Sequence, residues 1–209
     1  VKDIGQNMTQ ICFMGPATYI MAHKRYHVNL LAKVLKEGKP FYHSLIITRN
    51  DAGIKSIGDL KVKTFAFGDL NSTSGYVIPR AILKEAGIDV NDLLYYNHIT
   101  HFDDIASAVL KGDFDAGAVM DSVAYRFQDQ GLRFLQFSEE IPGFTICCST
   151  ALDEGSATIL KAALLSLNVS TSEGTMILKS LDKDYTGFAD AHDADYNGVR
   201  LKMSKLGLL

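Results

Sequence analysis

The sequence predicts an α/β protein with two lobes, in which a middle segment is inserted between two outer ones. Short apolar runs alternate with helical stretches of about 10 to 15 residues, a pattern typical of parallel α/β units. Two β-rich runs, 42–48 and 144–148, flank a middle segment that has strands and helices of its own. We therefore expect parallel-rich sheets flanked by helices, with two crossover strands joining the lobes.

In the first outer segment, apolar runs predict strands at 10–14 and 29–35, and the β-rich run at 42–48 predicts a third. A helix is expected from Pro16 to about Tyr26. Proline is favoured just inside a helix start, because the N–H that it lacks is not needed there.

The middle and last segments continue the alternation. Strands are expected at 64–67, 91–96, 114–120, 132–137 and 144–148. Helices are expected from 77 to a stop at Gly87, from the Asp103-Asp104 pair to Lys111-Gly112, at 121–130, 156–167 and 172–181, and in a basic stretch at the end.

Composition and charge exclude two function classes. The 209 residues are 47% hydrophobic and 22% charged, which is ordinary for a soluble globular protein. The net charge of −3, without a basic run, offers no footprint for nucleic acid. The sequence also lacks an apolar stretch of about 18 residues or more, the length that a membrane-spanning helix needs.

A run of hydroxyl residues lies between the strand at 64–67 and the helix that follows it. The stretch Asn71-Ser-Thr-Ser-Gly75 places three hydroxyls and a glycine at this junction. The first turn of a helix leaves backbone N–H groups unpaired and favours negative charge, so the junction could hold a phosphate-like or carboxylate group. The alternative is that Ser72 or Ser74 is an ordinary N-cap. The stretch is not a Walker A loop, because no Gly-Lys-Ser/Thr is present.

The three cysteines, Cys12, Cys147 and Cys148, lie in apolar, strand-like runs. An odd number with two adjacent members is not a disulfide framework, so we interpret them as buried, inert thiols. A vicinal Cys147–Cys148 disulfide is the alternative.

Two polar clusters resemble catalytic or metal sites. His101 with Asp103 and Asp104 could be such a site, but two acids before a helix also cap it. A second cluster, in the tail, does not fit a regular calcium loop and is interpreted as solvated; it comprises Asp190, His192, Asp193 and Asp195. We expect no cofactor, no metal and no catalytic residue.

Six segments, in this order, together resemble the phosphate/phosphonate/phosphite-type solute-binding proteins of ABC transporters, a module that also serves as an extracellular sensor domain. They are Cys12-Phe-Met-Gly-Pro-Ala-Thr-Tyr19, Tyr42-His-Ser-Leu-Ile-Ile-Thr48, Ile57-Gly-Asp-Leu-Lys61, Asn71-Ser-Thr-Ser-Gly75, Gly112-Asp-Phe-Asp-Ala-Gly117 and Ile141-Pro-Gly143. The resemblance covers nearly the whole chain, and the Ser-Thr-Ser-Gly stretch is its most specific part.

The resemblance implies a two-lobed, type II periplasmic-binding-protein fold with ligand in the interlobe cleft. Lobe I would comprise 1–47 and 144–209, and lobe II 48–143. The anionic head group would be held by the hydroxyls and N–H groups of the serine-rich stretch, and other contacts would come from both lobes. The implied ligand-binding residues are Ser72, Thr73, Ser74, Gly75, Tyr42, His101, Asp121 and Tyr19.

The chain departs from the family pattern at two places. Family members open with a strand and a helix before the Gly-Pro motif, and the sequence in hand begins after that point, so we expect lobe I to lack them. Family members often have a ligand-binding His where this chain has Phe102. His101 is adjacent and could take its place after a one-residue slip in the loop, or the phenylalanine marks a changed ligand.

Binding without chemistry is the function that we predict. The chain would bind a small oxyanion as the solute-binding component of an ABC importer, with the transporter permease as partner, in the periplasm or outside the cell. The alternatives are an extracellular sensor domain joined to a transmembrane module, an enzyme on the same fold, and the effector domain of a regulator. We expect no nucleic-acid partner, and a monomer or weak dimer.

Overall fold

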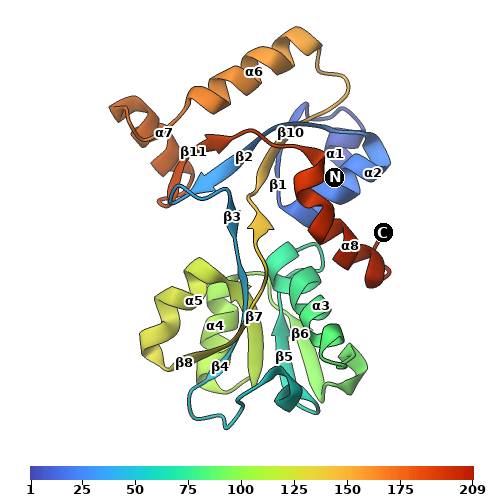
Figure 1. The fold of residues 1–209 in the computed structure, drawn as a ribbon, viewed down its shortest axis with the longest axis vertical. Helices are drawn as coiled ribbons and strands as arrows, with labels where there is room; N and C mark the ends of the chain where they lie inside the picture. Colours follow the sequence, from blue (N-terminus) through green and yellow to red (C-terminus); the bar gives the residue numbers. More distant parts are fainter. The chain divides into compact units, whose positions relative to one another are not determined.

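The computed structural model describes residues 1–209, which form two compact units (Figure 1). Unit 1 comprises 1–42 and 142–200, and unit 2 comprises 43–141 and 201–209. The sequence expectation differs at three places: it puts residues 43–47 and 201–209 in lobe I, and residues 142–143 in lobe II. Residues 44–48 belong to unit 2 because they pair with a strand of that unit along their whole length.

Unit 1 is built on a four-stranded sheet in the order β1-β10-β2-β11. Its strands are β1 (Ile11–Met14), β2 (Asn29–Lys36), β10 (Thr145–Cys148) and β11 (Tyr185–Ala189). All three pairings are antiparallel, so the expectation of parallel-rich sheets is wrong for this unit. The reason is that β10 lies between β1 and β2, which run in the same direction, and β10 runs opposite to both.

The five helices of unit 1 are α1 (Lys2–Gly5), α2 (Pro16–Tyr26), α6 (Glu154–Ser166), α7 (Ser172–Leu181) and the start of α8 (Asn197–Lys205). Of these, α6 and α7 pack apolar side chains against this sheet. One cluster joins Ala32 and Val34 of β2 to Leu178 of α7 and Phe188 of β11. In a second cluster the ring of Tyr19 lies 4.8 Å from that of Tyr196.

Unit 2 is built on a five-stranded sheet in the order β6-β5-β7-β4-β8. Its strands are β4 (Ser44–Arg49), β5 (Thr64–Phe67), β6 (Tyr95–His98), β7 (Ala116–Met120) and β8 (Leu132–Phe137). β5 pairs in parallel with β6 and β7, as the alternating pattern predicts, whereas β4 pairs antiparallel with β7 and β8. The chain passes between the units through β3 (Phe41–Tyr42) and β9 (Ile141–Pro142), which pair with each other.

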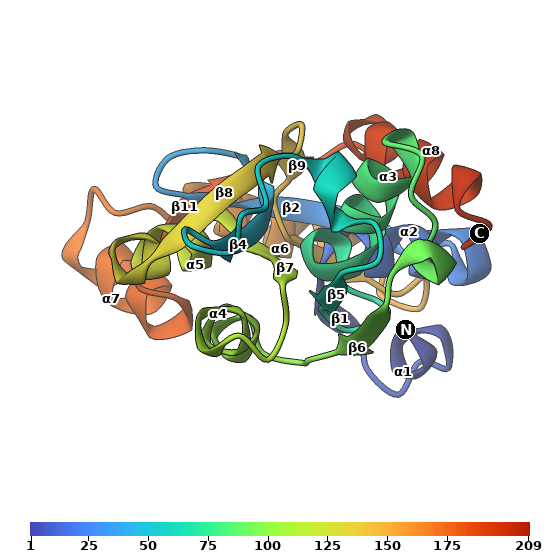
Figure 2. The same cartoon turned by 90° about the horizontal axis from the view of Figure 1, so that it is seen from below.

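Helices cover both faces of the unit 2 sheet (Figure 2). Its helices are α3 (Ile78–Glu85), α4 (Phe102–Lys111) and α5 (Asp121–Phe127), with 3-10 turns at Ile57–Leu60, Val90–Asp92 and Gln128–Gln130. Because strand side chains alternate between faces, Leu45 and Ile47 pack with α4, whereas Ile46 packs with Leu83 of α3. Burial on both faces explains why β4 is a continuous apolar run.

Two elements differ from the sequence expectation. The strand expected at 91–96 is a 3-10 turn, Val90–Asp92, followed by β6 at Tyr95–His98, an edge strand whose first three residues are exposed. Strand β11 lies in the tail, where the sequence predicts no strand. It forms by pairing with β2, which lies far away along the chain and leaves no local signal. None of the helices has both the length and the apolar character needed to cross a membrane.

Candidate functional site

The serine-rich stretch forms the start of a helix, as predicted. A π-helical turn, η2 (Thr73–Val77), follows β5 and continues directly into α3. Ser72 is its N-cap, and its Oγ accepts a hydrogen bond of 3.0 Å from the N–H of Gly75. The N-cap interpretation is therefore correct for Ser72.

Ser74 differs from Ser72, because its hydroxyl is not used by the fold. Ser74 is 2% exposed, and neither its N–H nor its Oγ makes a hydrogen bond within the chain. Its Oγ is open to solvent, because no buried side-chain oxygen of the chain lacks a partner. Thr73, which precedes it, is also buried. A buried helix start with an unpaired N–H and an unpaired hydroxyl is a suitable place for an anion.

Two neighbouring strands fix the position of this helix start. The buried Ser44, which opens β4, donates its hydroxyl proton to the backbone oxygen of Ser74 over 2.6 Å. The N–H of Gly68, just after β5, donates to the oxygen of Gly75 over 2.7 Å. A Cβ on Gly75 would lie 2.9 Å from the Cα of Gly68, so the approach requires glycine. The geometry is therefore set before any ligand arrives.

An aromatic wall lies beside the same loop. His98, at the end of β6, places its Nδ1 2.7 Å from the backbone oxygen of Gly68. Its ring is stacked on Phe67 at 5.9 Å and meets Tyr76 edge-on at 5.1 Å. Phe102 opens α4, and its Cε1 would lie 2.9 Å from a Cβ on Gly75. An apolar ring edge therefore contacts the loop at the position where family members often carry a histidine.

Asp121 lies at the start of α5, and both oxygens of its carboxylate accept hydrogen bonds from backbone N–H groups. Its Oδ2 accepts the N–H of His43 over 2.9 Å, and its Oδ1 accepts the N–H of Ser122 over 2.7 Å. The N–H of Asp121 donates in turn to the oxygen of His43. Asp121 therefore holds the end of β7 to the start of β4, close to Ser44.

The side chain of His101 makes no hydrogen bond within the chain, although its backbone oxygen accepts the N–H groups of Asp104 and Ile105. It is exposed and precedes α4 without a side-chain capping bond. The expected capping acids, Asp103 and Asp104, lie in the first turn of α4, and Asp103 also pairs with Arg126. His101 and Phe102 therefore differ in their surroundings, since only Phe102 contacts the loop.

The remaining two predicted residues belong to unit 1. Tyr19 is buried in α2 and donates its hydroxyl to Oδ1 of Asp193 over 2.8 Å; burial, followed by this bond, raises the pKa of Tyr19. Tyr42, the last residue of β3, is 5% exposed, and its ring stacks on that of Phe144 at 5.5 Å.

The acidic tail cluster is engaged by cations. Asp190 pairs with Lys161, Asp193 with Arg200 and Asp195 with Lys33. No three His, Cys, Asp or Glu side chains of the chain are grouped so that they could hold a metal ion.

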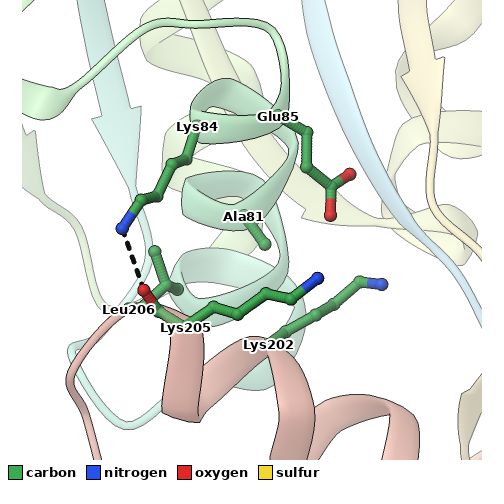
Figure 3. A pocket seen from close by; sticks show the side chains of 6 residues that line it. All are labelled: Ala81, Lys84, Glu85, Lys202, Lys205 and Leu206. Carbon is green, nitrogen blue, oxygen red and sulfur yellow. Dashed lines mark hydrogen bonds between the residues drawn. The ribbon is translucent and has the colours of Figure 1, made fainter.

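A separate basic pocket of about 230 Å³ lies in unit 2, between α3 and the end of α8 (Figure 3). Lys84 donates to the backbone oxygen of Lys205 over 2.9 Å, and Lys202 pairs with Glu139 over 2.9 Å. The hydrogen bond from Lys202 lowers the pKa of Glu139. None of the predicted site residues lines this pocket; its lining is Ala81, Lys84, Glu85, Lys202, Lys205 and Leu206.

Sequence reasoning missed two residues that shape the site. Ser44 reads as part of an apolar strand, and its contact with Ser74 depends on a partner 30 residues away. His98 reads as a loop residue before a helix, although it ends a strand next to β5. The only signal for them in the sequence was the residue type: Ser44 is a hydroxyl residue at the start of a strand, and His98 is a histidine near a predicted site.

A family model described as "ABC transporter, phosphonate, periplasmic substrate-binding protein" matches residues 1–196. Among curated proteins, the phosphate-import protein PhnD of Mycolicibacterium smegmatis is 28% identical over 91% of this chain and 67% of its own length. The phosphonates-binding periplasmic protein of Escherichia coli is 35% identical over 38% of this chain, which corresponds to 25% of that protein. The matched residues therefore span about two thirds of the first relative and a quarter of the second.

Solved structures share the fold. PhnD1 of Prochlorococcus marinus, solved in complex with methylphosphonate, superposes with a TM-score of 0.87 at 19% identity, over 100% of this chain and 82% of that one. A binding protein component of a Pseudomonas aeruginosa ABC phosphonate transporter gives 0.82 at 22% identity, over 96% and 70%. The aliphatic sulphonate-binding protein SsuA of Escherichia coli gives 0.70 at 16% identity, over 100% and 74%. These similarities confirm the type II periplasmic-binding-protein fold.

Proposed function

Because this chain belongs to the phosphonate-type periplasmic substrate-binding proteins of ABC transporters, we propose that it binds a small oxyanion of the phosphonate, phosphate or phosphite class. Its relatives are binding proteins and not enzymes, which agrees with the prediction that the chain catalyses no reaction. It would deliver the ligand to a transporter permease, from a periplasmic location.

The observation that carries the proposal is the unpaired N–H and hydroxyl of the buried Ser74 at the start of η2. An oxyanion placed there would accept both bonds and would complement the helix dipole. Ser72, whose Oγ accepts the N–H of Gly75 and can still donate its own proton, and Thr73 are kept as contacts that the resemblance implies. Gly75 allows the close packing of the loop. We retain Tyr42, Asp121, His101 and Tyr19 as contacts implied by the resemblance. Of these, Asp121, Tyr19 and Tyr42 also have structural partners.

Within this ligand class, Phe102 favours phosphonates over phosphate and phosphite. Its ring edge contacts the helix start that would hold the head group, so a ligand with an apolar substituent would replace water against that ring. Inorganic phosphate and phosphite offer only polar atoms or a single hydrogen there. We therefore propose that methylphosphonate and longer alkylphosphonates bind more tightly than phosphate.

The first prediction concerns Ser74→Ala, tested by titration calorimetry with methylphosphonate, phosphate and phosphite. We expect one site in the unmodified protein. Loss of a charge-assisted hydrogen bond worth about 1.5–3 kcal/mol should weaken binding by about 10- to 150-fold.

Ser180→Ala, on the exposed side of α7, is the matched control and should leave affinity unchanged. Absence of heat with all three anions, from a protein shown to be folded by circular dichroism, would contradict the proposed ligand class. Equal affinity of the Ser74→Ala variant and the unmodified protein would contradict the placement of the site.

A further inference from the structure

The three cysteines of the chain lie on two paired strands of unit 1. Cys12 is in β1, and Cys147 and Cys148 are in β10. The register of this antiparallel pair places Cys12 directly opposite Cys147 and Ile11 opposite Cys148. Directly opposed residues point to the same face of a sheet, so the thiols of Cys12 and Cys147 share a face.

The Cα atoms of this pair lie within the range that a disulfide can span. The N–H of Ser149 donates to the oxygen of Gln10, which marks that pair as hydrogen-bonded, and alternation then makes Cys12–Cys147 a hydrogen-bonded pair as well. The Cα atoms of such a pair lie about 5.5 Å apart, within the range of about 4.4–6.8 Å that disulfides span.

The register of β1 and β10 disfavours a disulfide between either of the other two pairs of cysteines. Cys147 and Cys148 are adjacent in a strand, so their side chains point to opposite faces. Cys12 and Cys148 are also on opposite faces, because Cys148 is opposed by Ile11. The vicinal disulfide left open by the sequence is therefore not the favoured pairing.

The environments of the two thiols differ. Cys147 is fully buried, and this burial raises its pKa to about 12; the neighbouring Cys12 and Cys148 act in the same direction. Cys12 is half-buried. Since the thiolate is the reacting species, Cys12 reacts first, and Cys147 reacts readily only before β1 and β10 have packed.

We propose that Cys12 and Cys147 form a cross-strand disulfide when the chain folds in an oxidising compartment. The Cys12 thiolate attacks a disulfide such as oxidised glutathione and releases one glutathione thiolate. The Cys147 thiolate then attacks the Cys12 sulfur and releases the second. The two cysteines lose two protons and two electrons in total, and glutathione disulfide is reduced to two thiols.

Two properties of the bond follow. It would close a loop that contains residues 43–141 of unit 2, and closure of a long loop restricts the unfolded chain. Side chains at hydrogen-bonded positions lie farther apart than at non-hydrogen-bonded ones, so the bond would be strained and readily reduced. Its occurrence in the cell depends on the proposed periplasmic location, whereas its formation in vitro does not.

The test is to unfold the reduced protein in guanidinium chloride and to refold it in a glutathione redox buffer. We expect the free thiols measured in denaturant to fall from the three of the sequence to one. Tryptic mass mapping without reduction should join the peptide that contains Cys12 to the one that contains Cys147 and Cys148. The melting temperature should fall by several degrees on mild reduction.

Variants assign the bond. Cys148→Ser should retain the cross-link, and Cys12→Ser, at a half-buried position that tolerates a polar group, should lose it together with the effect of reductant on melting. Three free thiols in the oxidised protein, or a cross-link that survives in Cys12→Ser, would overturn the proposal. Methylphosphonate titration of each form is a separate readout, so a failure of the proposed ligand does not decide this test.

Discussion

At the scale of single residues, the three hydroxyls of the serine-rich loop have three different roles. Ser72 caps the helix, Thr73 is buried, and Ser74 keeps its N–H and hydroxyl unpaired while its backbone oxygen holds Ser44. The sequence alone does not separate them, because each of the three is a suitable N-cap. Only the hydrogen bonds identify Ser74 as the residue to test.

A second prediction at this scale concerns Phe102→His. The new imidazole would offer an N–H donor beside Gly75 in place of the apolar ring edge. We expect the preference for methylphosphonate over phosphate to decrease by about 2- to 10-fold, as one net hydrogen bond is worth about 0.5–1.5 kcal/mol. Calorimetry with both anions measures the ratio.

Phe137→His is the matched control, because Phe137 is 42% exposed on β8 and its ring lies against those of His43 and Phe134. A ratio that does not change in Phe102→His, or that changes equally in both variants, would show that Phe102 does not set ligand preference.

At the scale of elements, the site depends on one junction, where β5 ends and η2 begins. Gly68 and Gly75 approach so closely that neither can carry a Cβ without movement, since each would place it 2.9 Å from the other's Cα. The hydroxyl of Ser44 then joins the junction to β4. Strand and helix are therefore fixed to each other at the residues proposed to bind the anion.

The prediction for this junction is that Gly75→Ala destabilises the protein by about 1–3 kcal/mol, the usual range for overpacking. The new methyl group would meet Gly68, Phe102 and the Oγ of Ser72 at 2.9 Å each. Urea unfolding followed by circular dichroism gives the change in the free energy of unfolding, and calorimetry should show weaker anion binding.

Gly198→Ala is the matched control. Gly198 lies in α8 with no atom near its Cβ position, so alanine there should stabilise the helix by about 0.5–1 kcal/mol. If Gly75→Ala were as stable as the unmodified protein, the junction would be less tightly packed than the contacts indicate.

At the scale of the molecule, ion pairs join the C-terminal segment to the sheet of unit 1. Lys33 of β2 donates to Asp195 over 2.7 Å, and Asp193 accepts from Tyr19 and pairs with Arg200. Burial opposes the charge on both carboxylates, but their hydrogen bonds and neighbouring cations prevail and lower both pKa values below the ordinary 3.8.

The pH dependence of stability follows from the sign of these shifts. A carboxyl group whose pKa is lower in the folded state stabilises the protein above its unfolded pKa and loses this effect as pH falls through the folded value. We therefore expect the free energy of unfolding to decrease below about pH 4, with about 1 kcal/mol attributable to the partly exposed Asp195 pair.

Urea unfolding between pH 3 and pH 7 tests this, with Asp195→Asn expected to flatten the acid side of the profile. Asp113→Asn, at an exposed position without a side-chain partner, is the control and should leave the profile unchanged. If the free energy of unfolding of Asp195→Asn depended on pH as that of the unmodified protein does, the Lys33–Asp195 pair would not cause the acid destabilisation.

Most of the local structure was determined by the sequence. Apolar periodicity predicted the helices at 16–26, 156–167 and 172–181 to within a few residues, and the hydroxyl run was predicted at a strand-to-helix junction. The type II fold and the family were also predicted, because the motifs occur along nearly the whole chain. These signals are local, so they need no knowledge of distant partners.

Only the tertiary structure decided which elements become neighbours. The antiparallel sheet of unit 1, strand β11, the contact of Ser44 with Ser74 and the opposition of Cys12 and Cys147 all join residues that are far apart in the chain. Sequence periodicity reports which face of a strand is buried, but not which strand lies beside it. The pairing follows from how each unit packs its own apolar faces. The hydrogen bonds of this arrangement then distinguish Ser74 from Ser72.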